Sequence, residues 1–315
     1  MKVGIVGAGM AGLSCAELLD REGHEVILFD KGRGPGGRMA TRRMATPIGE
    51  ASFDHGAQYF TVRDPDFARA VAEWESEGHV ARWSAAGADA WVGVPGMNAV
   101  IRKQASDHDV RFGMHVHGID KRPEGWLLNF ANDVPSGPFD ALILAIPAEQ
   151  AAALLSLHDF DLAKIALRAR SQPCWTALFA FAEALDAPDE PIRERGDISW
   201  AVRNRAKPGR TGPEAWVVQA QPRWSAEHIE QPMEEVSSLL FEMLGEALSL
   251  ALPDPVAATA HRWRFAMSSG TGDGALWNPR TSLGACGDWL VGPRIECAWL
   301  SGRQMAQRVL EMAEV

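Results

Sequence analysis

Three glycines near the start of the chain are spaced as G-x-G-x-x-G. They are Gly7, Gly9 and Gly12, and they follow residues 2–6, a short apolar run typical of a buried strand. In such a turn the first glycine permits a tight bend, the second lets backbone approach a pyrophosphate, and the third allows a helix to pack closely on the strand. The pattern predicts a phosphate-binding turn at the start of a helix.

An acidic residue follows at the distance that such a unit requires. The predicted helix begins with Met10 and Ala11, which we include among the binding residues, and ends near Gly23. A second apolar strand, residues 25–29, leads to Asp30, whose carboxylate can accept hydrogen bonds from ribose hydroxyls. The order strand, glycine turn, helix, strand and acid raises the pattern above a chance match.

A second glycine-rich loop, residues 31–38, directly follows the acid and carries basic side chains. A guanidinium makes forked, charge-assisted contacts with phosphate, and glycines let the backbone come near. A nicotinamide dehydrogenase has no need of such a loop, so we add Lys31, Gly37 and Arg38 to the predicted dinucleotide site. The alternative interpretation is a solvated basic loop.

These two loops resemble those of the flavoprotein amine oxidase superfamily, in which an arginine of the second loop faces the FAD pyrophosphate. Residues 283–299 resemble the C-terminal flavin motif of the same superfamily. The resemblance implies that Asp288 meets the ribityl hydroxyls, that Glu296 and Ala298 meet the flavin edge, and that Val116 belongs to the cofactor site. From the two glycine loops, Asp30 and this last motif we predict that FAD is bound non-covalently. An ordinary capped C-terminal helix is the alternative for the last motif.

Within this superfamily the chain is most similar to the renalase family, in its bacterial form. Four segments carry this resemblance: residues 36–42, 53–60, 261–266 and 287–299. The resemblance implies an oxidase for isomers of dihydro-NAD(P) that carry the hydride at ring position 2 or 6. The hydride would pass to flavin N5, O2 would be reduced to H2O2, and NAD(P)+ would be the product.

The segment Gly56-Ala57-Gln58-Tyr59 is the most discriminating of the four. We expect it to pass the reactive face of the flavin, where Gly56 and Ala57 let the backbone come close to the ring. Gln58, which would also contact the cofactor, and Tyr59 are the candidates for positioning substrate and for catalysis. A plain loop after a strand is the alternative.

Arginines are the predicted contacts for the phosphates of a nucleotide substrate. They are Arg42, Arg262 and Arg264, the last two on a segment that could equally be a half-buried strand with alternating Trp and Arg. Hydride transfer requires orientation and exclusion of water more than a general base. We find no Ser-His-Asp order and predict no metal, since His115 and His117 offer only two ligands.

Other functions stay open at this point. An FAD-dependent amine oxidase would share the cofactor site but should have an aromatic cage or an acidic amine pocket, and a chain with one tyrosine cannot build a two-tyrosine cage. A desaturase or porphyrinogen-type oxidase would need a longer apolar tunnel. A flavin-binding sensor or scaffold without enzymatic activity is compatible with the motifs.

Composition agrees with a globular enzyme. The chain has 315 residues and a net charge of −10, which argues against nucleic acid as a partner. It has no apolar run long enough for a membrane span and no signal peptide, so we expect a cytoplasmic protein that does not bind membranes. The four cysteines form no C-x-x-C pair and are expected to be reduced. Oligomeric state is not predicted.

The alternation of elements predicts an α/β flavoprotein of the amine-oxidase and glutathione-reductase type. A discontinuous Rossmann-like FAD-binding domain would comprise residues 1–62, 92–147 and 281–315. An α+β substrate-binding domain, with an antiparallel sheet over the flavin, would comprise residues 63–91 and 148–280. Loops are expected over residues 186–195 and 203–213, which are rich in Pro, Gly and charge.

Overall fold

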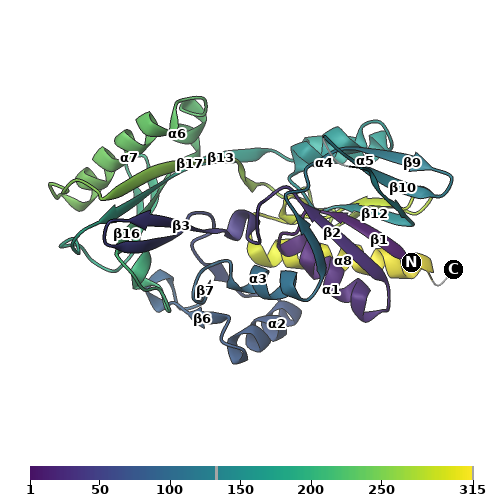
Figure 1. Ribbon diagram of the computed structural model, residues 1–315, viewed down its shortest axis with the longest axis horizontal. Helices are drawn as coiled ribbons and strands as arrows, with labels where there is room; N and C mark the ends of the chain where they lie inside the picture. The colour runs from purple at the N-terminus through teal and green to yellow at the C-terminus, as the bar shows by residue number, and fades with distance from the viewer. Residues whose placement is uncertain (132–133, 314–315) are drawn as a thin grey trace.

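The protein has two lobes, each built on its own sheet (Figure 1). The structure is a computed structural model that describes residues 1–131 and 134–313. The first lobe holds a six-stranded sheet in which five neighbouring strands are parallel and the sixth, β18 at one edge, runs antiparallel to its neighbour. In spatial order its strands are β18 (Leu276–Asn278), β19 (Leu283–Ala285), β12 (Ala141–Leu144), β1 (Lys2–Val6), β2 (Glu25–Asp30) and β8 (Asp109–Phe112).

Two apolar clusters cover the faces of this sheet, because alternate residues of each strand point to opposite sides. Val3 and Ile5 belong to one cluster, whereas Leu142 and Leu144 belong to the other. The first face packs against helices, and the second packs against a small antiparallel sheet and two further helices. These elements are α1 (Met10–Arg21), α2 (Pro65–Ser76), α3 (Ala99–Ser106) and α8 (Ile295–Ala313) on the first side, and β9 (Val116–Arg122), β10 (Gly125–Phe130), β11 (Ser136–Phe139), α4 (Ala148–Leu155) and α5 (Phe160–Arg168) on the second.

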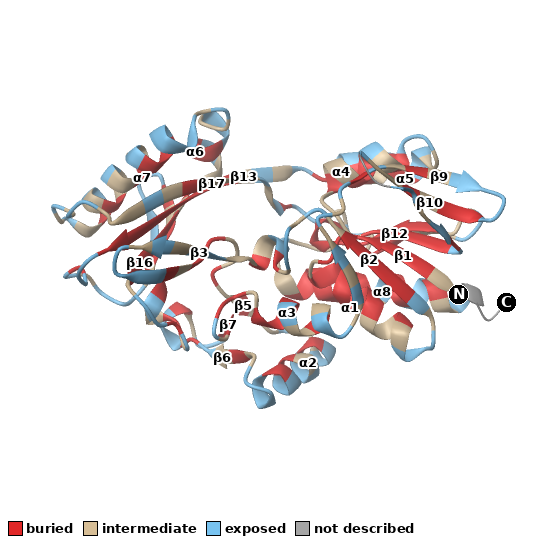
Figure 2. Ribbon diagram, viewed as in Figure 1, coloured by how far each residue is buried: buried red, intermediate tan, exposed pale blue. Residues whose placement is uncertain are grey.

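The second lobe holds the predicted antiparallel sheet, which has five strands with two helices against it. In spatial order they are β14 (Ile192–Arg195), β15 (Ile198–Arg203), β16 (Glu214–Ala220), β13 (Ser171–Phe181) and β17 (Ala257–Ser268), and the helices are α6 (Pro222–Glu227) and α7 (Met233–Leu248). The paired strands β13 and β17 run from this lobe toward the other (Figure 1). Buried residues concentrate in the strands of both sheets (Figure 2).

Two small sheets complete the fold between the lobes. They are the hairpin β3 (Thr41–Thr46) and β4 (Gly49–Asp54), and the set β5 (Phe60–Thr61), β7 (Ala90–Gly93) and β6 (Val80–Arg82). Phe53 of β4 is fully buried against Leu178 and Val217 of the five-stranded sheet. The residues between β4 and β5 are therefore held at the junction of the two lobes.

The structure differs from the sequence prediction at two places. Residues 192–195, predicted as loop, form strand β14, which pairs with β15 at the edge of the sheet. Charged residues are common on edge strands, where they discourage pairing with another chain, so the composition of this strand resembled that of a loop. The β3–β4 hairpin was not predicted at all.

The predicted division into two domains stays a prediction. Helices α4 and α5, which it assigned to the second domain, contact the same apolar cluster as the six-stranded sheet. Among the helices of residues 1–131 and 134–313, none is long and apolar enough to cross a membrane.

Candidate functional site

The glycine turn after β1 is shaped so that two of its positions accept only glycine. Gly7 has a φ of +104°, and a Cβ atom there would lie 2.3 Å from the carbonyl oxygen of Ala145. A Cβ atom on Gly12 would lie 2.0 Å from the carbonyl oxygen of Gly7. By contrast, apart from Gly9 and its two chain neighbours, no atom of the described residues lies within 4 Å of a Cβ placed on Gly9, and Gly9, the N-cap of α1, provides no side-chain cap. The start of α1 is thus open to an anion, as a pyrophosphate requires.

Asp30 lies beside this turn and its carboxylate is held by two backbone N–H groups. Ala8 donates to Oδ2 at 2.8 Å, and Gly32 donates to Oδ1 at 2.7 Å. Each oxygen keeps a lone pair for a ribose hydroxyl. The Met114 N–H donates to the Asp30 carbonyl at 2.9 Å, which brings the predicted residue Val116 to the same end of the sheet.

Arg38, from the N-terminal part of the chain, contacts Asp288, from the C-terminal part. Its guanidinium forms a fork with the Asp288 carboxylate, with N···O distances of 2.5 and 2.8 Å, and also donates to the Ala266 carbonyl at 3.2 Å. A Cβ on Gly37 would lie 3.9 Å from the Cα of Gly9, so the second loop lies against the first. The residues predicted for phosphate and ribityl groups therefore form one polar strip, and this strip fits a dinucleotide.

Glu296 has a structural task that the sequence did not indicate. Its side chain is 1% exposed, and Oε1 accepts the N–H groups of Arg63 and Asp64 at 2.6 and 2.7 Å. The carboxylate thus holds the segment that leads into α2. A contact between Glu296 and a flavin would have to come from its backbone, together with neighbouring Ala298 on α8.

Residues 54–59 form a segment, here called the strap, that runs from β4 to β5 past Arg38. The Ala57 N–H donates to the Arg38 carbonyl at 2.8 Å, and the Trp263 indole donates to the His55 carbonyl at 2.7 Å. A Cβ on Gly56 would lie 2.0 Å from the Arg38 carbonyl oxygen, so only glycine permits this approach. The structure places the predicted Gly56 and Ala57 directly against the arginine loop.

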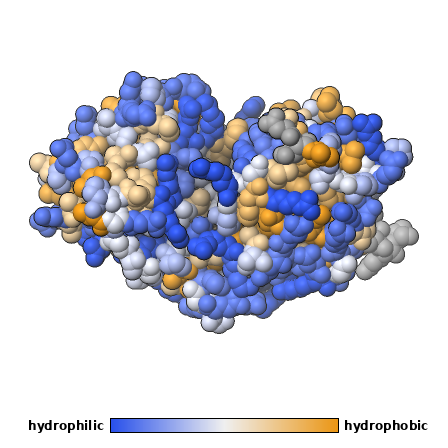
Figure 3. Space-filling model, viewed as in Figure 1, coloured by the Kyte–Doolittle hydropathy of each residue, from blue (hydrophilic) through white to orange (hydrophobic). Residues whose placement is uncertain are grey.

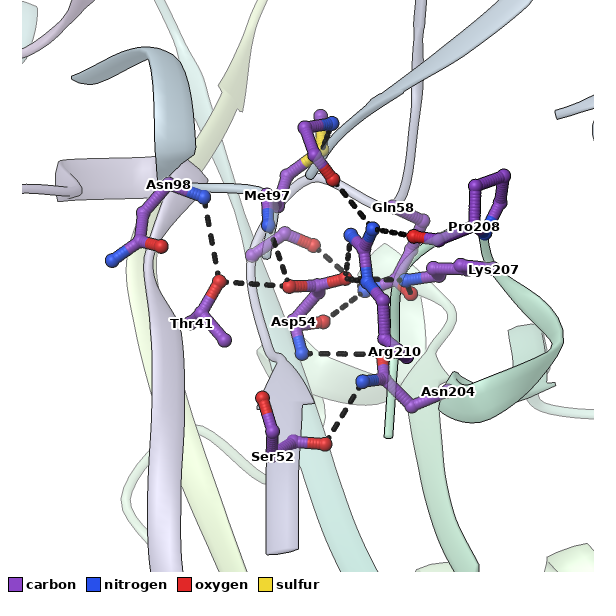
Figure 4. Close-up of polar contacts among 12 residues, drawn as sticks. Thr41, Ser52, Asp54, Gln58, Met97, Asn98, Asn204, Lys207, Pro208 and Arg210 are labelled. Carbon is purple, nitrogen blue, oxygen red and sulfur yellow. Dashed lines mark hydrogen bonds and ion pairs between the residues drawn. The ribbon is translucent and has the colours of Figure 1, made fainter. Parts of the chain in front are cut away.

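A buried ionic cluster anchors the start of the strap, and the sequence analysis missed it. Asp54 is fully buried, and its Oδ2 contacts Arg210 Nη2 at 2.6 Å and Lys207 Nζ at 3.2 Å (Figure 4). Its Oδ1 accepts the Met97 N–H and the Thr41 hydroxyl, each at 2.8 Å. Burial alone would raise the pKa of Asp54, but the two cations outweigh burial and hold the pKa below its usual range.

Tyr59 and Trp200 form an aromatic wall at the end of the strap, with ring centroids 5.3 Å apart and planes inclined by 32°. The Arg193 guanidinium lies over both rings, 5.9 Å from the Tyr59 centroid and 4.7 Å from the Trp200 centroid. Trp83 packs on Trp200 at 6.3 Å. Among the described residues, neither indole N–H of these two tryptophans has a hydrogen-bond partner.

The other residues predicted to bind substrate lie in different environments. Gln58 is 5% exposed, and its amide is engaged within the protein, not directed to solvent. Arg42 is exposed, and its side chain makes no hydrogen bond or ion pair within the part of the chain described. Arg264 is also exposed, but its guanidinium binds Glu230 at 2.7 and 2.8 Å. Because Trp263 faces the strap, strand alternation directs Arg264 to the opposite face of β17.

His55 should make the protein sensitive to mild acid. Burial, reinforced by the nearby His261 and Arg42, lowers the pKa of His55 to about 4. The unfolded chain, with an imidazole pKa of 6.5, then binds more protons than the folded one between these values. The stability contributed by neutral His55 is complete above pH 6.5 and is lost as pH falls toward 4.

We therefore expect His55→Gln to reduce the pH dependence of the unfolding free energy in this window, by up to about 1.4 kcal/mol per pH unit. Urea unfolding of parent and variant between pH 4.5 and 7, about the range of histidine titration, measures the slope. His117→Gln, at an exposed position, is the control. An unchanged slope in His55→Gln would show that His55 is not the group responsible.

Comparisons with known proteins agree with this geometry. Residues 5–74 match the family model of an NAD(P)-binding Rossmann-like domain, and residues 76–310 match that of a flavin containing amine oxidoreductase. The chain belongs to the flavin-containing amine oxidoreductase family. It is accordingly an FAD-dependent oxidoreductase, and the predicted α/β flavoprotein fold is confirmed.

Solved structures share the fold of this oxidoreductase at low sequence identity. A candidate protoporphyrinogen oxidase from Exiguobacterium sp. 255-15 superposes with a TM-score of 0.75 at 12% identity, covering 100% of this chain and 99% of that one. Cyclohexylamine oxidase from Brevibacterium oxydans IH-35A gives 0.69 at 13% identity, with the same coverage. An engineered putrescine oxidase gives 0.71 at 11% identity, covering 98% of each chain.

A curated relative matches over a short stretch only. L-amino acid oxidase from Cerastes cerastes is 55% identical over 42 residues, which are 13% of this chain and 8% of the relative. Such a stretch supports a shared local motif and not a shared substrate. Within the described residues, no group of three or more His, Cys, Asp or Glu side chains is arranged to hold a metal ion.

Proposed function

We propose that this oxidoreductase binds FAD non-covalently and oxidises 2- or 6-dihydro-NAD(P) to NAD(P)+. The bound flavin would supply the redox chemistry: a hydride leaves the substrate carbon for N5, and its two electrons, with one further proton, reduce O2 to H2O2. The chain's own residues would hold the substrate ring in place and exclude water. An orientation role of this kind needs no general base.

The observation that carries the proposal is the charge beside the aromatic wall. The group that lies over Tyr59 and Trp200 is the Arg193 guanidinium, and the ammonium group of Lys207 lies 5.6 Å from the Trp83 ring centroid. An alkylammonium substrate at this wall would meet like charges, which is unfavourable. A nucleotide brings phosphates that the exposed Arg193 attracts, and its nicotinamide ring can stack on an aromatic face.

A further cation supports the same assignment. Arg42 lies near enough to His55 and His261 to lower the pKa of both imidazoles, in each case after the larger effect of burial. Its guanidinium has no carboxylate partner among the described residues, unlike those of Arg262 and Arg264, which share Glu230. Strongly hydrophilic residues also gather between the lobes, below the groove that separates them (Figure 3). Arg42 is our first candidate for a phosphate contact.

The cysteines near the predicted flavin edge support non-covalent binding. Burial raises the pKa of Cys286 to about 12 and raises that of Cys297 above its usual value. The reactive form of cysteine is the thiolate, and these environments keep both thiols protonated. Acid denaturation should release all yellow colour into the supernatant; colour retained on the polypeptide would contradict non-covalent binding.

Anaerobic mixing tests the substrate class directly. We expect 6-dihydro-NADP or 2-dihydro-NAD to bleach the flavin, and readmitted O2 to restore its colour with one H2O2 per NAD(P)+ formed. Cyclohexylamine and putrescine should bleach it slowly or not at all. Rapid bleaching by an amine alone would favour the amine oxidase alternative, and no bleaching by either class would favour a flavin-binding sensor.

Arginine variants test how the nucleotide is held. Arg42→Ala should slow flavin reduction by the dihydronicotinamide dinucleotide by roughly tenfold or more, and reduction by the dihydronicotinamide riboside much less. Arg264→Ala tests the other predicted contact, for which the ion pair with Glu230 leads us to expect a smaller effect. Equal slowing of both substrates by Arg42→Ala would remove the phosphate assignment.

A further inference from the structure

We propose that Lys207 is a positioning residue that acts through Gln58 to fix the peptide between Gly56 and Ala57. Resting on the proposed function, the inference concerns the part of the strap assigned to the flavin's reactive face. Lys207 lies 149 residues from Gln58 in sequence, just after the short helix η3 (Asn204–Ala206), and is 2% exposed.

The ammonium group of Lys207 joins the two ends of the strap. Its Nζ contacts Asp54 Oδ2 at 3.2 Å and donates to Gln58 Oε1 at 2.9 Å (Figure 4). The Trp83 ring, 5.6 Å away, occupies a further side of the ammonium group. Two of these groups belong to the strap and the third, Trp83, lies elsewhere in the chain, so the lysine is held from several directions.

The contact with Lys207 holds the oxygen side of the Gln58 amide. A lysine can only donate, so the amide must present its oxygen to Nζ. The amide nitrogen is then directed to the backbone, where it donates to the carbonyls of Asp54 at 2.6 Å and Gly56 at 3.0 Å. Without a donor at position 207, the amide oxygen loses its partner and the side chain is less firmly held, so its grip on both carbonyls weakens.

The Gly56 carbonyl transmits this arrangement to the reactive part of the strap. It accepts from Gln58 and also from Gln219 Nε2 at 2.8 Å, while the adjoining Ala57 N–H donates to the Arg38 carbonyl. Both sides of the Gly56–Ala57 peptide are therefore fixed. Lys207 controls one of the two amides that hold the carbonyl.

Neutralising Asp54 does not explain why a lysine is buried here. Arg210 already contacts Asp54 Oδ2 through Nε at 3.2 Å and Nη2 at 2.6 Å, so one carboxylate faces two cations. Burial lowers the pKa of Lys207 to about 8, with Asp54 opposing this effect and Arg210 adding to it. The surplus cation is costly in this environment, and its contact with Gln58 is what Arg210 does not supply.

The charged groups that face Lys207 are Asp54 and Arg210, and its remaining neighbours, Gln58 and Trp83, carry no charge at neutral pH. A neutral amine still donates hydrogen bonds. Positioning by Lys207 should therefore persist when the ammonium group loses its proton. This separates positioning from a role in which lysine transfers a proton.

The test uses Lys207→Met, which keeps the length of the stem but removes every donor. With 6-dihydro-NADP we expect kcat to fall by roughly tenfold to a hundredfold, with KM changed less than about twofold. The visible circular dichroism of the bound FAD, which needs no substrate, should change in the same variant. Lys164→Met on the exposed face of α5 is the matched control and should resemble the parent in both measurements.

Two substitutions of Gln58 test the same contact independently of whether Lys207→Met folds. Gln58→Glu keeps an oxygen for Lys207 but cannot donate to Gly56, so it should reproduce the change in dichroism. Gln58→Leu should slow turnover as Lys207→Met does, and the double variant should be no slower than the slower single variant. The proposal is wrong if the two substitutions multiply each other's effect on kcat in the double variant. It is also wrong if Lys207→Met keeps the dichroism and kcat of the parent.

The pH dependence of turnover tests the role of Lys207, whereas the reaction of the parent with dihydronicotinamides tests the proposed function. An alkaline limb near pH 8 that is present in the parent and absent from Lys207→Met would show that the lysine acts by its proton, against our inference. A parent that binds FAD yet ignores dihydronicotinamides would refute the proposed function only. The dichroism comparison would still decide the role of Lys207.

Discussion

Asp54→Asn is expected to lower the free energy of unfolding by roughly 3–5 kcal/mol, the cost of removing one partner from a buried ionic cluster. Two cations, Lys207 and Arg210, would remain buried with no carboxylate between them. The asparagine amide would also place a donor or a weaker acceptor against both. The start of the strap would lose its anchor, so bound flavin should be lost at lower urea concentrations than in the parent.

Urea unfolding at pH 7 measures the effect. Glu227→Gln on α6 removes an ion pair that is exposed at both partners, and we expect it to change stability by less than about 1 kcal/mol. The pKa of Asp54 is depressed in the folded protein, so its stabilisation is present above pH 3.8 and is lost as pH falls below that value. The difference between Asp54→Asn and the parent should shrink accordingly. A difference below about 1 kcal/mol at pH 7 would mean that the cluster is not a net source of stability.

The parts of this fold that the sequence predicted are those encoded by neighbouring residues. The turn of Gly7, Gly9 and Gly12, and Asp30 at the end of the next strand, all lie within one unit of 30 residues, and their spacing reflects steric limits that the structure retains. Three strands of the second lobe, β13, β15 and β16, were likewise evident as apolar runs. Local geometry and local sequence agree at these places.

The ionic cluster was not predictable in the same way. Lys207 and Arg210 belong to a stretch rich in Pro, Gly and charge, which in most proteins is a solvated loop. Their partner Asp54 is about 150 residues away, and only the packing of the β3–β4 hairpin on the five-stranded sheet brings them together. A single sequence contains no signal for that contact.

Side-chain direction explains the remaining differences. Arginines 262 and 264 were treated as candidates because they are cationic, yet strand β17 turns them toward Glu230 while Trp263 between them faces the strap. The register of β17 in the sheet decides which of its side chains face the strap, and a shift of one residue would exchange the two faces of the strand. Similarly, Glu296 has the predicted place in the fold, but its carboxylate holds the backbone before α2.

Arg38→Ala should weaken FAD binding by about 1.5–3 kcal/mol, the range for hydrogen bonds to charged groups, or roughly 10- to 160-fold in Kd. The guanidinium lies between the glycine loops and Asp288, where its fork holds a carboxylate that is 8% exposed. Removing it takes away the predicted phosphate contact and leaves that carboxylate without its cation. The FAD affinity of Arg38→Lys should lie between those of the parent and Arg38→Ala, because a lysine keeps the charge but not the forked contact.

Titration of apoprotein with FAD, followed by flavin fluorescence, gives the Kd of each variant. Arg33→Ala is the matched control, since Arg33 lies in the same loop but is exposed. If Arg38 binds the pyrophosphate through its geometry, Arg33→Ala should change Kd by less than about twofold, as a surface charge screened by salt would. Equal weakening by both substitutions would instead mean that the loop attracts FAD through its overall charge. Unchanged affinity in Arg38→Ala would remove Arg38 from the cofactor site.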